Sequence, residues 1–210
     1  MLALVLFGDV IRSRRDSVAA TAWLRTLTAD LAEAYPASDV HAPFEFTQGD
    51  ELQGLLVASA DPMRAILRAA LLPNRVAMRW VVVAGEVDPG SGPATQRSGP
   101  AFITARERLA VAAARRELLA AVSEDPAANR ILDVLAPVLG ELLSDLTRRQ
   151  REIAWPILVE GLRRSEAAEQ LRVSRATVSV AADRAHVRSI GELARLVHTL
   201  LTGTTVAPDG

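Results

Sequence analysis

The stretch that decides the fold is Leu2-Ala-Leu-Val-Leu-Phe-Gly-Asp9, an apolar run closed by a Gly-Asp pair. A short run of Leu and Val that ends in glycine is typical of a buried strand, here residues 2–11. A second pair, Gly49-Asp50, lies in Phe46-Thr-Gln-Gly-Asp-Glu-Leu-Gln-Gly-Leu-Leu56, where a turn separates two strand-like segments. If the first run is central and the hairpin lies beside it, both aspartates meet at one edge of a sheet.

Helix and strand signals alternate through the N-terminal half of the chain. We expect a helix at 17–35, strands at 41–47 and 51–58, a helix at 61–72 and a strand at 76–87. This βαββαβ order predicts an α+β fold with a ferredoxin-like, palm-type antiparallel sheet and both helices on one face. In that arrangement the first strand is central and lies beside the hairpin's second strand. After a loop at 88–99, the chain is expected to be almost wholly helical, with helices at 100–121 and 127–143.

A different unit begins near residue 147. Thr147-Arg-Arg-Gln150 predicts a capping box at the start of a helix. A short helix, a tight turn at 172–174 and a second helix from Arg175 follow, and Ser174 is a good N-cap for the second helix. The predicted domains are therefore a palm domain at 1–122, a connecting helix at 123–146, a helix-turn-helix at 147–203 and a flexible tail at 204–210.

Residues 166–179, Glu-Ala-Ala-Glu-Gln-Leu-Arg-Val-Ser-Arg-Ala-Thr-Val-Ser, resemble the helix-turn-helix of sigma-factor region four and of response regulators. The resemblance implies that the helix from Arg175 enters the major groove of double-stranded DNA. The residues expected nearest the bases are Arg175, Ala176 and Ser179, and those expected nearer the phosphates are Arg172, Ser174 and Thr177. The alternative is that this unit packs against a protein partner or a second copy of the chain.

Charge supports a DNA-facing C-terminal unit. Residues 147–210 contain ten arginines against seven acidic residues, a net charge of +3, and the rest of the chain has the compensating −4. Asp183 and Glu192 would repel phosphates, so we expect them to lie away from the groove. The whole 210-residue chain has a formal net charge of −1, so any basic surface must be local.

Composition excludes several classes of chemistry. There is no cysteine, which excludes disulfides, thiolate catalysis, zinc fingers and iron–sulfur clusters. There is no lysine, which excludes Walker A and Schiff-base sites, and three scattered histidines argue against a histidine-based metal site. No apolar stretch reaches the ~20 residues of a membrane span. The N-terminus lacks the basic region and cleavage site of a signal peptide, so we expect a cytoplasmic protein.

The two Gly-Asp pairs predict a polar site. The carboxylate oxygens of Asp9 and Asp50 are ligands of the kind that Mg²⁺ prefers. The same two carboxylates would be the catalytic groups if the protein is an enzyme. No cofactor is certain from the sequence. The residues expected to bind a nucleotide ligand are Asp9, Arg12, Ser13, Arg14, Asp50 and Gln53. Alternatively, Asp9 caps a turn, Asp50 follows the preference of a tight hairpin, the arginines form a solvated loop, and Glu51 and Gln53 lie on a solvated strand face.

The N-terminal part distantly resembles the class III nucleotidyl cyclase catalytic domain. The matching segments are Phe7-Gly-Asp9, Gly49-Asp50, Val83-Ala-Gly-Glu-Val87 and Gly99-Pro-Ala-Phe-Ile-Thr-Ala105. Counted from Gly99, the transition-state Asn and Arg of that family fall on Ile103 and Glu107, and Arg106 and Arg108 are expected to point elsewhere. The base-reading lysine of adenylyl cyclases is absent as well. Loss of these residues argues against cyclase activity, because they stabilise charge in the transition state.

A closer resemblance is to the SatD-like family of bacterial proteins. The matching segments are Gly8-Asp-Val-Ile-Arg-Ser-Arg14, Thr47-Gln-Gly-Asp-Glu-Leu-Gln-Gly-Leu55 and Ser98-Gly-Pro-Ala-Phe102. The resemblance implies a cyclase-like N-terminal fold joined to a helix-turn-helix. The sequence thus favours a homodimeric DNA-binding transcriptional regulator whose N-terminal domain senses a ligand or mediates dimerisation. The alternative is a magnesium-dependent nucleotidyl or phosphoryl transferase that uses Asp9 and Asp50.

Overall fold

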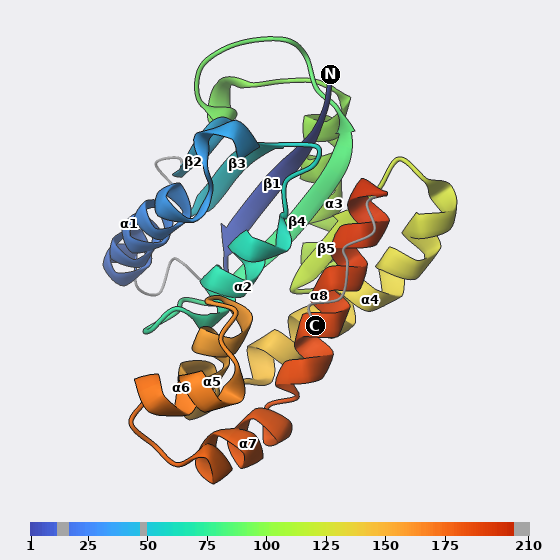
Figure 1. Ribbon diagram of the computed structural model, residues 1–210. Coiled ribbons are helices and arrows are strands. Elements are labelled where there is room, and N and C mark those ends of the chain that lie inside the picture. Colours follow the sequence, from blue (N-terminus) through green and yellow to red (C-terminus); the bar gives the residue numbers. More distant parts are fainter. Residues whose placement is uncertain (12–16, 47–49, 204–210) are drawn as a thin grey trace.

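The computed structural model describes residues 1–11, 17–46 and 50–203 of the chain. These residues form a mixed α+β fold with one five-stranded sheet (Figure 1). The strands are β1 (Leu2–Val10), β2 (Val40–Phe46), β3 (Glu51–Val57), β4 (Met78–Glu86) and β5 (Leu119–Val122). The α-helices are α1 (Ser17–Ala34), α2 (Met63–Leu71), α3 (Pro100–Arg115), α4 (Pro126–Asp145), α5 (Arg148–Leu158), α6 (Arg164–Gln170), α7 (Arg175–Arg184) and α8 (Val187–Thr202). Short 3-10 turns, η2 (Ala37–Asp39) and η3 (Ala94–Gln96), complete the path.

The strand order is β2-β3-β1-β4-β5. Strand β1 is antiparallel to both β3 and β4, and β5 is parallel to β4. The prediction that the first strand is central and lies beside the second strand of the hairpin is confirmed by this pairing. The end of β1 therefore lies beside the start of β3, with Asp9 opposite Glu51.

Both faces of β1 are covered, which explains why its sequence is continuously apolar rather than alternating. Leu4 and Leu6 lie in a core cluster with α1, α2, α4 and the C-terminal helices. Val5 and Phe7 point to the opposite face and pack in a second cluster with α3 and η3. As expected, α1 and α2 share one face of the sheet, whereas α3 covers the other.

One helix prediction is wrong. Residues 119–122 form β5, not the end of a helix reaching residue 121. Helix α3 ends at Arg115, and Arg116 adopts a left-handed conformation with φ of 61°. The following Leu119-Ala-Ala-Val122 pairs with β4 and is buried between α3 and α4. Alanine favours helix intrinsically, but backbone pairing and burial on both faces override that preference.

The C-terminal helices are packed onto the sheet layer. Figure 1 shows α5, α6 and α7 gathered at one end of the molecule with α7 outermost, whereas α8 runs back beside α4. Helix α5 contacts α2, and α8 contacts α4, β4 and β5. One core cluster therefore continues from Leu4 of β1 to Leu201 of α8.

Candidate functional site

Asp9 lies at the end of β1, paired with Glu51 on β3 and Arg79 on β4. Its Oδ2 accepts a hydrogen bond from Arg79 Nη1 at 3.2 Å. Arg79 Nε also donates a hydrogen bond to the carbonyl oxygen of Glu117, at 3.0 Å, and this second bond holds the guanidinium in place. Asp9 thus takes part in an ion pair across the sheet.

Gly8 is required here by packing. A Cβ at this position would lie 2.6 Å from Cε of Met78 and 3.1 Å from the ring of Trp80. These two side chains fill the face opposite to Asp9, because neighbouring strand residues point to opposite sides. The glycine of the first Gly-Asp pair therefore has a structural role, and Asp9 alone faces the polar side.

The two aspartates of the sequence prediction lie together. The Asp50 carbonyl oxygen accepts the Val10 N–H at 3.0 Å, which ties the residue before β3 to the end of β1. Burial, followed by the negative charge of Asp50, raises the pKa of Asp9. Glu51 also raises this pKa, and Arg79 opposes the shift. The neighbouring carboxylates are thus near enough to disfavour the ionised form of Asp9.

Gln53 also belongs to this polar region. Its side chain is buried, and Nε2 donates a hydrogen bond to Glu51 Oε1. The alternative that Gln53 lies on a solvated strand face is therefore wrong. Arg12, Ser13 and Arg14, which were predicted to bind a ligand, lie outside the described residues.

The polar region includes residues that the sequence reasoning missed. Arg79 is one of them: it stands in an apolar strand, where a lone charge is a signal of a cross-strand partner. In the described part of the chain, no three acidic or histidine side chains are grouped so as to hold a metal ion. A cation at Asp9 would also compete with Arg79. Magnesium binding by Asp9 and Asp50 stays a prediction.

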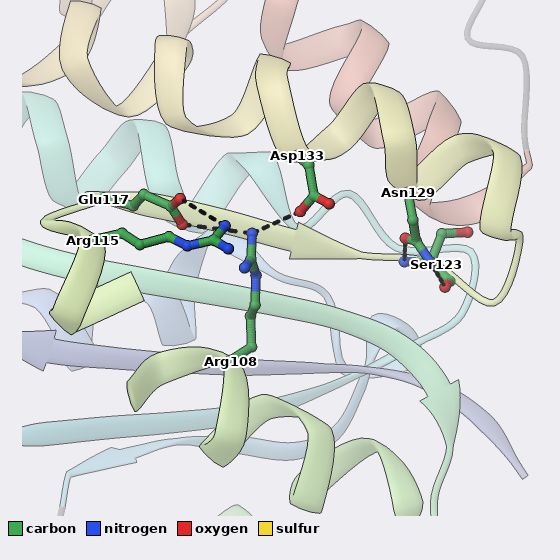
Figure 2. A network of polar contacts seen from close by, with 6 residues as sticks. All are labelled: Arg108, Arg115, Glu117, Ser123, Asn129 and Asp133. Carbon is green, nitrogen blue, oxygen red and sulfur yellow. Dashed lines mark hydrogen bonds and ion pairs between the residues drawn. The ribbon is translucent and has the colours of Figure 1, made fainter. Parts of the chain in front are cut away.

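The segment that resembles the cyclase helix is used differently here. Ile103 is 63% exposed, and Glu107 is exposed as well. Arg108 points away from the aspartates: its Nη2 lies 2.7 Å from Asp133 of α4 and 3.5 Å from Glu117, as Figure 2 shows. The expectation for Arg108 is confirmed. Arg106, two residues earlier in α3, lies over the ring of Phe7 on β1.

Arg106 lies over the face of β1 that α3 covers. Its guanidinium carbon lies 5.9 Å from the ring centroid of Phe7, two residues before Asp9 on the same side of the strand. This contact is with Phe7 and not with either aspartate, so the expectation that Arg106 points elsewhere stays a prediction.

The second candidate site is formed by α6, a tight turn and α7. Ser174 Oγ accepts the Thr177 N–H at 3.0 Å, and the Thr147 capping box is present at α5, so both capping predictions are confirmed. Arg172 in the turn has a left-handed φ of 54°. Ala168 and Val178 are buried between the helices, whereas Leu171 and Val173 pack against the same core from partly exposed positions.

The residues predicted to contact DNA lie mainly on the open side of α7. The exposed ones are Arg172, Ser174, Arg175, Ala176 and Thr177, whereas Ser179 is half-buried. Ser179 Oγ accepts a hydrogen bond from Arg164 Nη1 at 3.2 Å. Arg175 lies 3.8 Å from Glu169, with both side chains largely exposed.

Asp183 lies beside Ser179, one of the residues predicted to contact DNA, and its expected position away from the groove stays a prediction. Arg164 Nη2 donates to Asp183 Oδ1 at 2.8 Å while Nη1 contacts Ser179, so the two α7 residues are neighbours. They are four residues apart on one helix, which places them on the same side. The ion pair with Arg164 offsets the negative charge of Asp183. Glu192 is instead on α8, paired with Arg188 at 2.8 Å.

Comparison with known proteins adds little. No protein-family model matches the chain, and a search of curated proteins finds no match. A solved structure of a regulator of polyketide synthase expression from Bifidobacterium adolescentis aligns over 95% of this chain and 86% of that chain. The identity is 14% and the TM-score 0.27, a level of likeness that carries no inference. Among the described helices, none is long and apolar enough to cross a membrane.

Proposed function

We propose that the chain is a DNA-binding transcriptional regulator in which α6 and α7 form a helix-turn-helix and α7 enters the major groove. The observation that carries the proposal is the arrangement of α7. Its inner side, at Val178 and Ala182, is buried, and its first turn presents exposed polar side chains at the outer end of the molecule. A recognition helix uses its N-terminal residues for base edges in this way.

In this proposal Arg175 reads a base. Its side chain is 77% exposed, and its 3.8 Å contact with Glu169 is loose enough to exchange for a guanine edge. Arg172, Ser174 and Thr177 would lie nearer the phosphates. The net charge of +3 in residues 147–210 supports attraction to a polyanion.

The N-terminal domain is proposed to be a SatD-like, ferredoxin-like palm domain at 1–122, joined by 123–146 to the helix-turn-helix at 147–203. It would bind a nucleotide near Asp9, Asp50 and Gln53, or mediate formation of a homodimer. The sheet and α7 share one hydrophobic core, and α8 contacts both α4 and α7. We therefore expect the sheet and α7 to move as one unit. Ligand binding would then act by changing the placement of two such units relative to each other.

A test begins with selection of bound duplexes from a random DNA library, followed by fluorescence anisotropy on the selected site. Arg175→Ala should weaken binding by about 1–3 kcal/mol, roughly 5- to 150-fold. Arg25→Ala, an exposed arginine of α1, is the matched control and should leave affinity unchanged. Affinity should also fall steeply with salt. Equal affinities for the two variants would remove Arg175 from the interface, and failure to select any duplex would refute DNA binding.

A second candidate function is magnesium-dependent nucleotidyl or phosphoryl transfer. It is favoured by one observation, the effect of Asp50 on the pKa of Asp9 at the edge of the sheet. Mass spectrometry of products after incubation with nucleoside triphosphates and Mg²⁺ tests it, with Asp50→Asn as the control. A product made by the wild type and lost in the variant would support an enzyme. The absence of any product would leave no ground for this candidate.

A further inference from the structure

A cavity of about 650 Å³ lies between α2, α5, α6 and α8, where the sheet layer meets the helix-turn-helix. This volume is in the range of small-molecule sites in proteins. The cavity does not adjoin the polar region around Asp9, which lies at the end of β1. The cavity is therefore a separate candidate site.

The cavity wall has two kinds of surface. Met63, Leu67 and Ile157 contribute to an apolar side built from α2 and the end of α5. The charged side is mostly basic, since three arginines line the cavity against a single acid. These charged residues are Arg164, Arg188, Arg195 and Asp61. A ligand that matches both sides has an apolar body and a negative group.

His198 gives a second, independent sign of a ligand site. Its side chain lines the cavity and is only 8% exposed. Among the described residues, Nδ1 has no hydrogen-bond partner, although it lies 3.5 Å from Asp61 Oδ1. That carboxylate oxygen already accepts the Met63 N–H at 2.9 Å. A buried polar nitrogen whose nearest acceptor is this distant can take a further hydrogen-bond partner from the cavity that the ring lines.

Two of the arginines are placed to meet an anion. Arg195 Nε donates to the Gly191 carbonyl oxygen at 3.4 Å, near the limit of a hydrogen bond. Arg164, 40% exposed, donates to Ser179 at 3.2 Å and to Asp183 at 2.8 Å, so an anion in the cavity would share or replace these contacts with α7. Arg188 is paired with Glu192 of the same helix, also at 2.8 Å, and its side chain is 83% exposed. Guanidinium groups bind carboxylate and phosphate oxygens through paired N–H donors.

We propose that this cavity binds a small organic anion with an apolar body, whose negative group contacts Arg164 and Arg195. A small rotation of the His198 ring would let it join that contact. The negative group is a carboxylate or a phosphate ester, which share this recognition chemistry. Because Arg164 also contacts α7, binding would alter the surroundings of that helix, and any resulting change in DNA affinity rests on the function proposed above.

The test uses the full chain and the fluorescent sulfonate 8-anilinonaphthalene-1-sulfonate, without DNA. The dye should bind in a saturable manner, and Arg195→Met and Arg164→Met should each weaken binding about tenfold, the effect of losing roughly 1.4 kcal/mol. Methionine keeps an apolar stem while removing the charge. Arg130→Met, at an exposed position of α4 outside the cavity, is the matched control and should bind as the wild type does.

Competition identifies the ligand chemistry. Displacement by octanoate supports a carboxylate ligand, and displacement by adenosine monophosphate supports a phosphate ester. Octanol that displaces the dye as well as octanoate does would overturn the proposal, because an apolar surface would then suffice. Equal dye affinity in all three arginine variants would overturn it as well. Since no DNA is present, these outcomes are separate from those of the DNA-binding test.

Discussion

Replacement of Gly140 by alanine tests the contact between α4 and β5. Gly140 lies in the middle of α4, and a Cβ there would be 2.9 Å from the Leu119 backbone nitrogen and 3.1 Å from Leu119 Cβ. The nearest atom belongs to the backbone of a strand paired with β4, so it cannot rotate away. The helix or the strand must shift to admit the methyl group.

Two effects of opposite sign decide the magnitude. Alanine is favoured over glycine inside a helix by about 1 kcal/mol. Forcing an extra carbon into a close-packed contact costs about 1–3 kcal/mol. We therefore expect Gly140→Ala to lower the free energy of unfolding by roughly 1 kcal/mol, despite the better helix propensity.

Gly191→Ala in α8 is the matched control. Its Cβ would meet only Cδ2 of Leu158 at 3.2 Å, the mobile end of a partly exposed side chain. The helix-propensity gain should then prevail, which leaves the variant between unchanged and about 1 kcal/mol more stable. The difference between the two variants isolates the close approach of α4 to β5.

Urea unfolding followed by circular dichroism measures both variants. A lower midpoint with an unchanged slope would show that stability alone has changed. If Gly140→Ala is as stable as Gly191→Ala, the close approach of α4 to β5 does not exist in solution, and the placement of the fifth strand is wrong.

Two further predictions concern the candidate sites. Burial and the charge of Asp50 raise the pKa of Asp9 above 3.8 in the folded state. The folded protein therefore binds a proton at Asp9 more readily than the unfolded chain does. The resulting stability is present below pH 3.8 and is lost as the pH rises through the raised pKa. Asp9→Asn removes this loss, so its stability relative to the wild type should increase across that window in urea titrations at several pH values; a difference independent of pH would contradict the burial of the carboxyl group. Ser174→Ala removes the acceptor of the Thr177 N–H and should lower the free energy of unfolding by about 1 kcal/mol, whereas Ser174→Asp keeps an acceptor and should restore most of it; equal loss in both variants would show that the cap contributes nothing.

Much of the secondary structure could be predicted from local signals. The apolar run at β1, the turn around Asp50 and the caps at Thr147 and Ser174 placed the corresponding elements to within a few residues. These signals are strong because periodicity and capping act between residues close in sequence. The last strand carried no such signal, since Leu119-Ala-Ala-Val122 is short and rich in alanine.

The candidate sites were predicted less completely. Convergence of Asp9 and Asp50 followed from the expected order of strands. The ion pair of Asp9 with Arg79 did not, because it depends on the register between β1 and β4, across 70 residues of chain. The contact of Arg164 with Ser179 and Asp183 likewise depends on how α6 crosses α7.

The sequence by itself determined the type and order of the elements up to α3, the two Gly-Asp positions and the caps of the C-terminal helices. Only the tertiary structure decided that β5 is a strand, that Asp9 is paired with Arg79, and that α2, α5 and α8 line an open cavity with His198 in its wall. The physical reason is range. Propensity, capping and periodicity are settled within a few residues, whereas strand register, burial and cavity shape arise from packing between segments that the sequence keeps far apart.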